Sequence, residues 1–240
     1  MRPSSGSITS ASPPRGSPPG AVAPVAPPPD VLGILVRLPE PGRVKTRLAR
    51  AIGAETAAAL YARLAHHIVE RCTWPARYRT AIWYDPPGAG RAVRAWLGGL
   101  EVAEFLAQRG RGLGARLRAG FDTFFRRGAQ RVVLIGSDCP GVDRGVVTEA
   151  LGALRRHQVV LGPSEDGGYY LIGLTAPAPG LLRGIAWSTS QVFRQTLRNA
   201  RAAGLRVATL APRRDIDTVE DARSLNWLPA RKSRSPLTPL

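Results

Sequence analysis

Apolar residues recur along the chain in short continuous runs and in longer segments with helical spacing. The runs at 31–36 and 131–136 are bounded by turn residues, which is typical of buried parallel strands. Residues 53–72 place apolar side chains three or four positions apart, which predicts an amphipathic helix. The same patterns predict further strands at 78–84, 101–106, 159–162, 169–174 and 206–210, and helices at 91–97, 113–127, 144–157, 188–203 and 218–227.

This alternation of strands and helices predicts βαβ units around a mostly parallel sheet. We therefore expect one α/β domain over residues 31–228, with helices flanking the central sheet. Ligands of such open sheets bind beyond the carboxyl ends of the strands, so candidate functional residues are those that follow each strand.

The two ends of the chain have a different composition. Residues 1–30 are mostly Pro, Ser, Gly and Ala, and residues 229–240 are similarly poor in large apolar side chains. Such segments bury too little surface to offset the entropy of ordering, so we expect two disordered tails. No run is long enough to span a membrane, and two cysteines give no disulfide framework. We therefore predict a cytoplasmic protein with no membrane partner.

The formal charge of +17 comes almost entirely from arginine, because Lys45 and Lys232 are the only lysines. The arginines are scattered along the predicted helices instead of forming a recognition helix or a basic arm. A phosphate-bearing substrate accounts for this charge as well as nucleic acid does. We therefore place nucleic-acid binding behind the binding of a small anionic molecule.

The loop after the first strand predicts phosphate binding. It carries Arg37, Arg43, Lys45 and Arg47, and Gly42 lets the backbone approach a ligand closely. The loop matches neither the P-loop nor the dinucleotide-binding glycine pattern, which argues against an ordinary NTPase and against an NAD enzyme. The alternative is a solvated basic loop, which the presence of a lysine in an arginine-rich chain disfavours.

Carboxylates follow two later strands. Asp138 comes directly after the strand at 131–136, where it is well placed to hold Mg²⁺ or Mn²⁺ against a diphosphate, although it could instead cap the next turn. Asp215 and Asp217 follow the last strand and offer a second ligand. Asp217 with Glu220 also fits a capping box for the last helix, so Asp215 is the better metal candidate.

Two glycine-containing segments complete the candidate site. In the turn before the strand at 169–174, Glu165 or Asp166 could orient or deprotonate an acceptor hydroxyl, although Asp-Gly-Gly is also an ordinary hairpin turn. Gly112 and Gly114, with Arg116, precede or begin a helix, and the glycines would permit close contact with a nucleobase or sugar.

Four motifs in the same order resemble a bacterial family known as a domain of unknown function. They are PxPGxVKTRL at 39–48, GSDCP at 136–140, GPxxDGGYYLIG at 162–173 and DIDTxED at 215–221. Members of this family are also labelled radical-SAM/selenodomain-associated transferases or arsenosugar-biosynthesis glycosyltransferases. More distantly, the chain is similar to the guanylyltransferases that activate 2-phospho-lactate and the molybdenum cofactor. All of these belong to the GT-A, or nucleotide-diphospho-sugar transferase, fold class.

The resemblance implies roles for matching residues. Lys45 and Arg47 would contact phosphates, Asp138 would hold the metal, and Asp166 would face the acceptor together with its neighbours. Two features depart from the family pattern: its first cation is commonly lysine where this chain has Arg37, and the glycine-rich segment lacks the usual acidic residues. The residues expected around the acceptor are Glu165, Asp166, Gly167, Gly168 and Tyr169.

Three hypotheses follow. The first is a metal-dependent glycosyltransferase that uses a nucleotide-sugar donor, with Lys45, Asp138 and Asp166 as catalytic residues and a small-molecule acceptor. The second is a nucleotidyltransferase that transfers NMP from an NTP to a phosphorylated small molecule and releases pyrophosphate. The third is a non-catalytic module that binds nucleotides or nucleic acid.

Overall fold

The computed structural model describes residues 30–228, and the predicted tails lie outside this range apart from Asp30. Asp30 is the first residue of the first strand, where its carboxylate accepts two hydrogen bonds from Arg131, at 2.7 and 3.0 Å. The elements are β1 (Asp30–Arg37), α1 (Thr46–Ile52), α2 (Ala54–Cys72), β2 (Arg79–Asp85), the 3₁₀ helix η1 (Pro87–Ala89), α3 (Gly90–Leu97), β3 (Glu104–Ala107), α4 (Leu113–Arg126), β4 (Arg131–Ile135), α5 (Arg144–Ala153), β5 (Val159–Pro163), β6 (Tyr169–Leu174), α6 (Val192–Ala202), β7 (Val207–Thr209) and α7 (Val219–Ser224).

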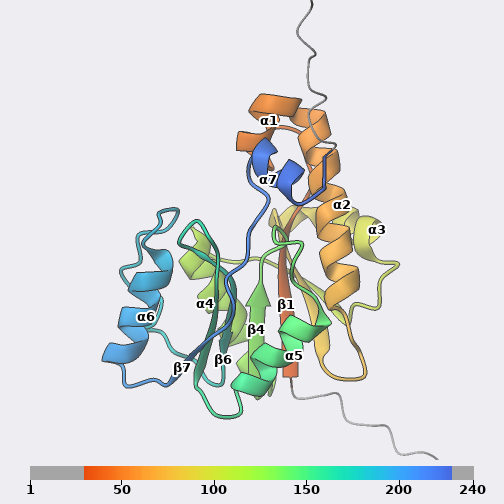
Figure 1. Ribbon diagram of the computed structural model, residues 1–240. Helices are drawn as coiled ribbons and strands as arrows, with labels where there is room; N and C mark the ends of the chain where they lie inside the picture. Colours follow the sequence, from red (N-terminus) through yellow and green to blue (C-terminus); the bar gives the residue numbers. More distant parts are fainter. Residues whose placement is uncertain (1–29, 229–240) are drawn as a thin grey trace, which may run out of the picture.

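The strands form one seven-stranded sheet in the order β3-β2-β1-β4-β6-β5-β7. All neighbours pair in parallel except β6, which runs antiparallel to both β4 and β5. The predicted α/β class and mostly parallel sheet are therefore confirmed. Figure 1 shows the parallel strands pointing toward α1 and α7, which lie together beyond the carboxyl ends of the strands.

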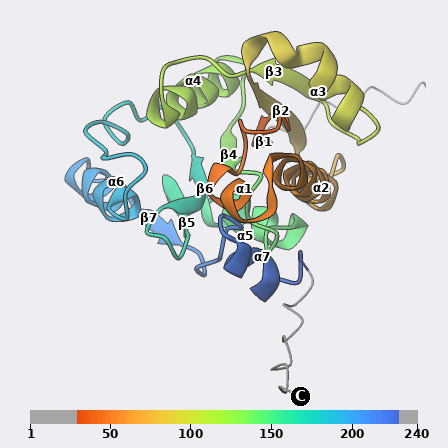
Figure 2. The same cartoon turned by 90° about the horizontal axis from the view of Figure 1, so that it is seen from above.

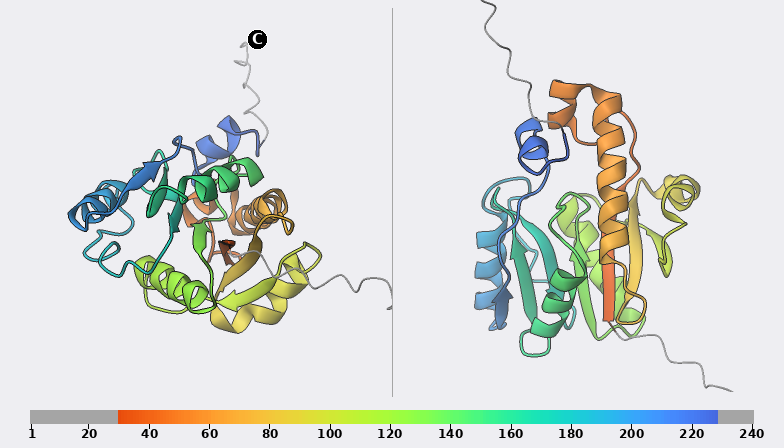
Figure 3. Two further views of the ribbon diagram at one scale, coloured as in Figure 1. Left: turned by 90° about the horizontal axis from the view of Figure 1, so that it is seen from below. Right: turned by 45° about the vertical axis from the view of Figure 1, so that its right-hand side comes forward.

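Helices cover both faces of the sheet, and each face buries its own apolar cluster. Side chains of α2, α3 and α5 pack with alternate residues of β1, such as Ile34, on one face. Side chains of α4 and of the segment leading through α6 pack on the other face (Figures 2 and 3). The alternation of β1 between these two clusters follows from the two-residue period of a strand.

A glycine in β1 permits close packing at the centre of the sheet. A Cβ at Gly33 would lie 2.5 Å from a side-chain carbon of Leu134 on the neighbouring β4 and 3.1 Å from Phe124 of α4. These contacts leave no space for a larger side chain, so the residue keeps β1, β4 and α4 in close contact below the strand ends.

Four predicted elements differ from the structure by three or more residues at one end. The strand predicted at 101–106 begins only at Glu104. The helix predicted at 144–157 ends at Ala153, and the one predicted at 188–203 begins only at Val192. Ser188 has a left-handed backbone (φ 64°), which an α-helix does not accommodate, so the chain enters α6 later than the apolar spacing suggests. The last helix is also shorter than predicted, ending at Ser224. Within residues 30–228 no helix is both long and apolar enough to cross a bilayer.

Candidate functional site

A buried lysine joins two of the predicted metal ligands. The Lys45 Nζ atom lies 2.8 Å from Oδ1 of Asp138 and 2.9 Å from Oδ1 of Asp217. Only 5% of the Lys45 side chain is exposed, whereas the two carboxylates are almost half exposed. Burial alone would lower the pKa of Lys45, but the charges and hydrogen bonds of the two carboxylates raise it above its ordinary value. Lys45 therefore stays protonated.

Local backbone structure brings these three residues together. Lys45 has a left-handed conformation (φ 47°, ψ 45°) and immediately precedes α1, while Asp138 follows β4. Asp217 lies just before α7, which packs near α1 above the strand ends (Figure 2). Gly42 also has a positive φ of 76° and has open space around it, as expected of a loop whose backbone can meet a ligand.

The capping box of α7 does not use Asp217, which leaves this residue free to pair with Lys45. The sequence interpretation that paired Asp217 with Glu220 is wrong, because Thr218 is the N-cap and Asp221 is its partner. The Thr218 Oγ1 accepts a hydrogen bond from the Asp221 N–H at 3.2 Å, and the Asp221 carboxylate accepts one from the Thr218 N–H at 2.9 Å. Helix capping by Thr218 leaves the Asp217 carboxylate available to Lys45.

Asp215 is the least satisfied carboxylate of the cluster. Its Oδ1 is buried and has no hydrogen-bond partner among residues 30–228. Burial, followed by the charge of Asp138, raises the pKa of Asp215 to about 7; Asp166 and Asp217 raise it further, and Lys45 opposes them. A buried carboxylate with unmet hydrogen-bonding capacity is costly unless a ligand compensates it.

A cavity of about 340 Å³ opens beside this cluster. Its walls come from the start of α1, the turn before β6 and the segment leading into α7. It brings together predicted phosphate, metal and acceptor residues that are far apart in the sequence. The lining residues are Arg47, Ser164, Glu165, Asp166, Arg214, Asp215, Asp217, Thr218 and Asp221.

The Asp-Gly-Gly turn combines a structural role with access to the cavity. Oδ1 of Asp166 accepts hydrogen bonds from the Ser164 hydroxyl at 2.6 Å and from the Gly168 N–H at 2.9 Å. Gly167 has a φ of 87°, and a Cβ there would lie 2.3 Å from the carbonyl oxygen of Ser190. One oxygen of Asp166 therefore shapes the turn, and neither of these contacts uses Oδ2.

The other predicted acceptor residues lie in two different environments. Glu165 lines the cavity, accepts a hydrogen bond from Nε of Arg214 at 2.7 Å and forms an ion pair with its Nη2 at 2.6 Å. The Tyr169 hydroxyl is buried, with no partner among residues 30–228, and burial raises its pKa above the ordinary value. The Tyr169 ring packs edge-on against Trp187, at 6.5 Å between centroids, which makes it part of the apolar packing beside the turn.

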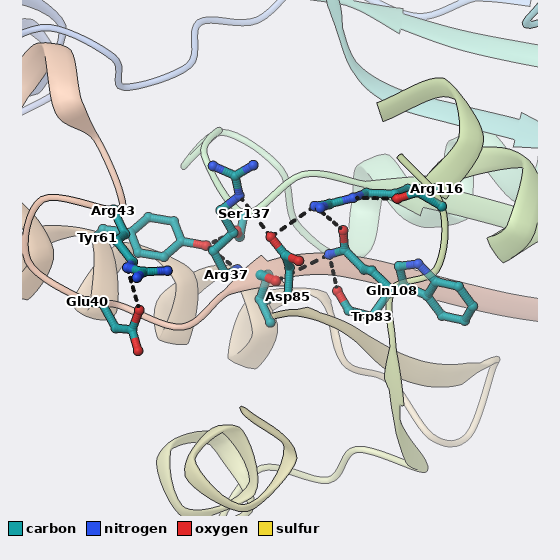
Figure 4. A network of polar contacts seen from close by, with 11 residues as sticks. Arg37, Glu40, Arg43, Tyr61, Trp83, Asp85, Gln108, Arg116 and Ser137 are labelled. Carbon is teal, nitrogen blue, oxygen red and sulfur yellow. Dashed lines mark hydrogen bonds and ion pairs between the residues drawn. The ribbon is translucent and has the colours of Figure 1, made fainter. Parts of the chain in front are cut away.

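Two of the three predicted nucleotide-binding arginines meet at a residue that the sequence analysis did not select (Figure 4). Oδ2 of Asp85 lies 2.9 Å from Nη1 of Arg116 and 3.5 Å from Nε of Arg37. Arg37 and Asp85 are register partners at the ends of β1 and β2, which explains their proximity. Gln108, whose side chain donates to the Val36 and Trp83 carbonyls, accepts a hydrogen bond from Arg116 at 3.1 Å.

Tyr61 connects this network to the β4 end. Its hydroxyl accepts a hydrogen bond from the Arg37 N–H at 2.9 Å and shares another with the Ser137 hydroxyl at 2.8 Å (Figure 4). Burial, together with the charge of Asp138, raises the pKa of Tyr61 to about 12, so the hydroxyl is a neutral bridge. A search for polar residues at every strand end could have found Asp85 and Ser137, but Tyr61 lies inside a helix and carries no such signal.

Gly112 and Gly114, the glycines predicted to approach a nucleobase or sugar at the start of α4, differ in their surroundings. Gly112 has a φ of 82° with open space around it, so the backbone before α4 is accessible. A Cβ at Gly114 would lie 2.7 Å from the Trp187 indole, so Gly114 serves the packing of α4 against that ring. Of the glycine-rich segment, Gly112 is therefore the position where a ligand can approach.

This sheet order, with a basic loop after β1 and carboxylates after β4 and β7, defines a protein of the nucleotide-diphospho-sugar transferase fold class. The model of the family described as "Uncharacterized protein conserved in bacteria (DUF2064)" matches residues 68–189, and the chain belongs to this family. The resemblance seen in the sequence motifs is thereby confirmed. A comparison with curated protein sequences gives no significant match.

Solved structures show the same fold. A candidate nucleotide-diphospho-sugar transferase from Desulfovibrio desulfuricans G20 is 33% identical, with 87% of this chain and 92% of that chain covered and a TM-score of 0.76. The 4-diphosphocytidyl-2C-methyl-D-erythritol synthase from Anaerococcus prevotii DSM 20548 is 8% identical, with coverages of 80% and 95% and a TM-score of 0.53. A cytidylyltransferase from Leptospira borgpetersenii is 13% identical, with coverages of 85% and 89% and a TM-score of 0.51. The last two show similarity of fold alone.

Proposed function

We propose that this protein is a cytoplasmic transferase that binds a nucleotide-sugar through a divalent metal and transfers the sugar to a small-molecule acceptor. The observation that carries the proposal is the cluster of Asp138, Asp215 and Asp217 around Lys45, beside the cavity at the strand ends. The similarity to the candidate nucleotide-diphospho-sugar transferase from Desulfovibrio desulfuricans, at 33% identity, supports the same class of activity.

The carboxylate cluster fits Mg²⁺ or Mn²⁺. Its donors are hard oxygen atoms, and Oδ1 of Asp215 is buried without a partner among residues 30–228. Within those residues, no three His, Cys, Asp or Glu side chains are gathered closely enough to hold an ion by themselves. This suits Mg²⁺, which commonly takes one or two protein carboxylates and completes its shell with water and substrate phosphates.

Asp138 and Asp215 would hold the ion, and Asp217 is the alternative to Asp215 as the second carboxylate ligand. When bound, the ion would neutralise the diphosphate and so make it a better leaving group. Arg47, which lines the cavity, would bind the phosphates, and Gly42 and Gly112 would allow the backbone to approach the nucleotide.

The acceptor would enter beside the turn before β6. Its hydroxyl oxygen would bond to the anomeric carbon of the sugar as the bond from that carbon to the phosphate oxygen breaks. Asp166 lines the cavity and would accept the hydroxyl proton, while the nucleoside diphosphate leaves. The Ser164 and Gly168 contacts hold the Asp166 carboxylate in position for this role.

Nucleotidyl transfer is the second candidate. Here a phosphorylated acceptor would attack the α-phosphate of an NTP, and pyrophosphate would leave. The observation that favours it is the number of cations between the end of β1 and the start of α1, because Arg37, Arg43, Lys45 and Arg47 suit a highly charged leaving group.

Isothermal calorimetry of the full chain against UDP-sugars, GDP-sugars, GTP and CTP separates these functions. The titrations are performed with Mn²⁺ and then with EDTA, on the natural protein and on Asp138→Asn. We expect metal-dependent binding of one nucleotide-sugar, lost in the variant. Binding of an NTP instead would favour nucleotidyl transfer, and binding of neither class would contradict the proposal.

A further inference from the structure

We propose that Lys45, by pairing with the metal-binding carboxylates in the free protein, prevents them from binding a divalent ion until nucleotide is present. The ion and the nucleotide then bind together and not separately. The inference rests on the proposed function, because it concerns the order in which the ligands of that site bind. In this account the ammonium leaves the carboxylates when nucleotide phosphates arrive to receive it, and the carboxylates then become available to the ion.

Lys45 is already paired with two of the three carboxylates of the cluster. One ammonium group bridges Asp138 and Asp217, at 2.8 and 2.9 Å, and so pairs with one oxygen of each carboxylate. The Lys45 side chain is 5% exposed, so its ammonium is shielded from solvent, whereas both carboxylates are almost half exposed. An incoming dication meets both a nearby positive charge and carboxylates that are already paired.

The choice of residue supports a mobile role. Lys45 is the only lysine among residues 30–228 of a chain that otherwise uses arginine for positive charge. An ammonium on a four-carbon stem can turn from carboxylates to phosphates, whereas a guanidinium makes planar, paired contacts that fix its orientation. Lysine therefore suits a cation that must exchange partners during binding.

The backbone places Lys45 where such an exchange affects both sides of the cavity. Lys45 precedes α1, from which Arg47 lines the cavity, and Asp217 precedes α7, from which Asp221 lines it. The Lys45–Asp217 contact thus joins two helices whose starts are more than 170 positions apart in the sequence. Its release would relax the connection between α1 and α7 as the phosphates enter.

Mn²⁺ titration of the full chain without nucleotide tests the inference, with the signal of free Mn²⁺ followed by electron paramagnetic resonance. We expect the natural protein to bind Mn²⁺ weakly and Lys45→Met to bind it at least about tenfold more tightly, because the competing charge is removed. Arg50→Met is the matched control: it removes a positive charge from the exposed last turn of α1, away from the cavity lining, and should change the affinity by less than about threefold.

An affinity of Lys45→Met equal to or below that of the natural protein would overturn the inference. Thermal melting verifies folding, and Lys45→Gln replaces Lys45→Met if the latter does not fold. On the natural protein, amine labelling followed by mass spectrometry should show Lys45 equally protected in EDTA and in millimolar Mn²⁺; exposure by Mn²⁺ alone would also overturn it. These readouts use no nucleotide, so a failure of the proposed function appears separately, as absent nucleotide binding in calorimetry.

Discussion

Two aspartates at the same edge of the sheet have opposite electrostatic environments. Asp85, the last residue of β2, lies between the guanidinium groups of Arg37 and Arg116. Asp215, after β7, is surrounded by other carboxylates, and its buried Oδ1 has no partner within the described range 30–228. The comparison distinguishes a carboxylate that is paired with arginines from one whose buried oxygen has no partner among the described residues.

This difference assigns separate roles to the two regions. The Asp85 network fixes the ends of β1 and β2 and the start of α4 through ion pairs and the buried Gln108 amide. In the other region, the buried Asp215 carboxylate lies beside a cavity and close to other acidic side chains, which costs stability. A strongly raised pKa of a carboxylate near a cavity is typical of functional sites.

The largest effect should come from removing an unpaired carboxylate. Asp215→Ala should weaken Mn²⁺-dependent nucleotide binding by at least about a hundredfold, because an ion held by two carboxylates loses half of its protein ligands. Asp85→Asn should leave the dependence on Mn²⁺ intact. Calorimetry with Mn²⁺ and with EDTA measures both, and equal metal dependence in Asp215→Ala and the natural protein would argue against the assignment.

The raised pKa of Asp215 predicts a pH-dependent cost. Because its pKa of about 7 in the folded state exceeds the ordinary value of 3.8, the folded protein binds this proton more tightly than the unfolded chain. The free energy of unfolding should therefore fall as pH rises from about 4 to about 7. Asp215→Asn should remove this fall and, at pH 8 without metal, stabilise the protein by on the order of 2 kcal/mol. Urea unfolding in EDTA at pH 5 and pH 8 measures the free energy of unfolding of the natural protein and of Asp215→Asn. An equal change between the two pH values in both proteins would contradict the prediction.

Neutralising Asp85 should have the opposite sign. Asp85→Asn leaves Arg37 and Arg116 without their counter-charge in a partly buried setting, and we expect a loss of roughly 1.5 kcal/mol in the free energy of unfolding. Glu165→Gln, which breaks the solvent-exposed pair with Arg214, is the control and should give no measurable change. A stabilising Asp85→Asn would show that the two regions do not differ as described.

The smallest effect concerns the link between the two regions. Tyr61→Phe removes a buried hydroxyl that serves both the Arg37 N–H and the Ser137 hydroxyl, and should cost about 1 kcal/mol of unfolding free energy. Urea unfolding measures the loss. Ser137→Ala in the Tyr61→Phe background should add little, since their shared hydrogen bond is already gone.

The positions of Lys45, Asp138 and Asp215 could be predicted because each follows a strand, and parallel strands bring their carboxyl ends to one edge. Their pairing could not, since Lys45 and Asp217 meet only when α1 and α7 pack together. The antiparallel insertion of β6 between β4 and β5 also lies outside what apolar spacing predicts, because both strand directions share the same period. The capping box of the last helix was predicted one residue too early, because Asp217 with Glu220 and Thr218 with Asp221 both fit the same sequence spacing.

A crystal of the full chain grown with Mn²⁺ and the nucleotide selected by calorimetry, with data collected at the manganese absorption edge, tests the central claim most directly. The account predicts an anomalous peak within about 2.5 Å of oxygens of Asp138 and Asp215, with the nucleotide phosphates on the ion and Lys45 turned toward them. A peak elsewhere, or a bound nucleotide with Lys45 still bridging Asp138 and Asp217, would contradict it.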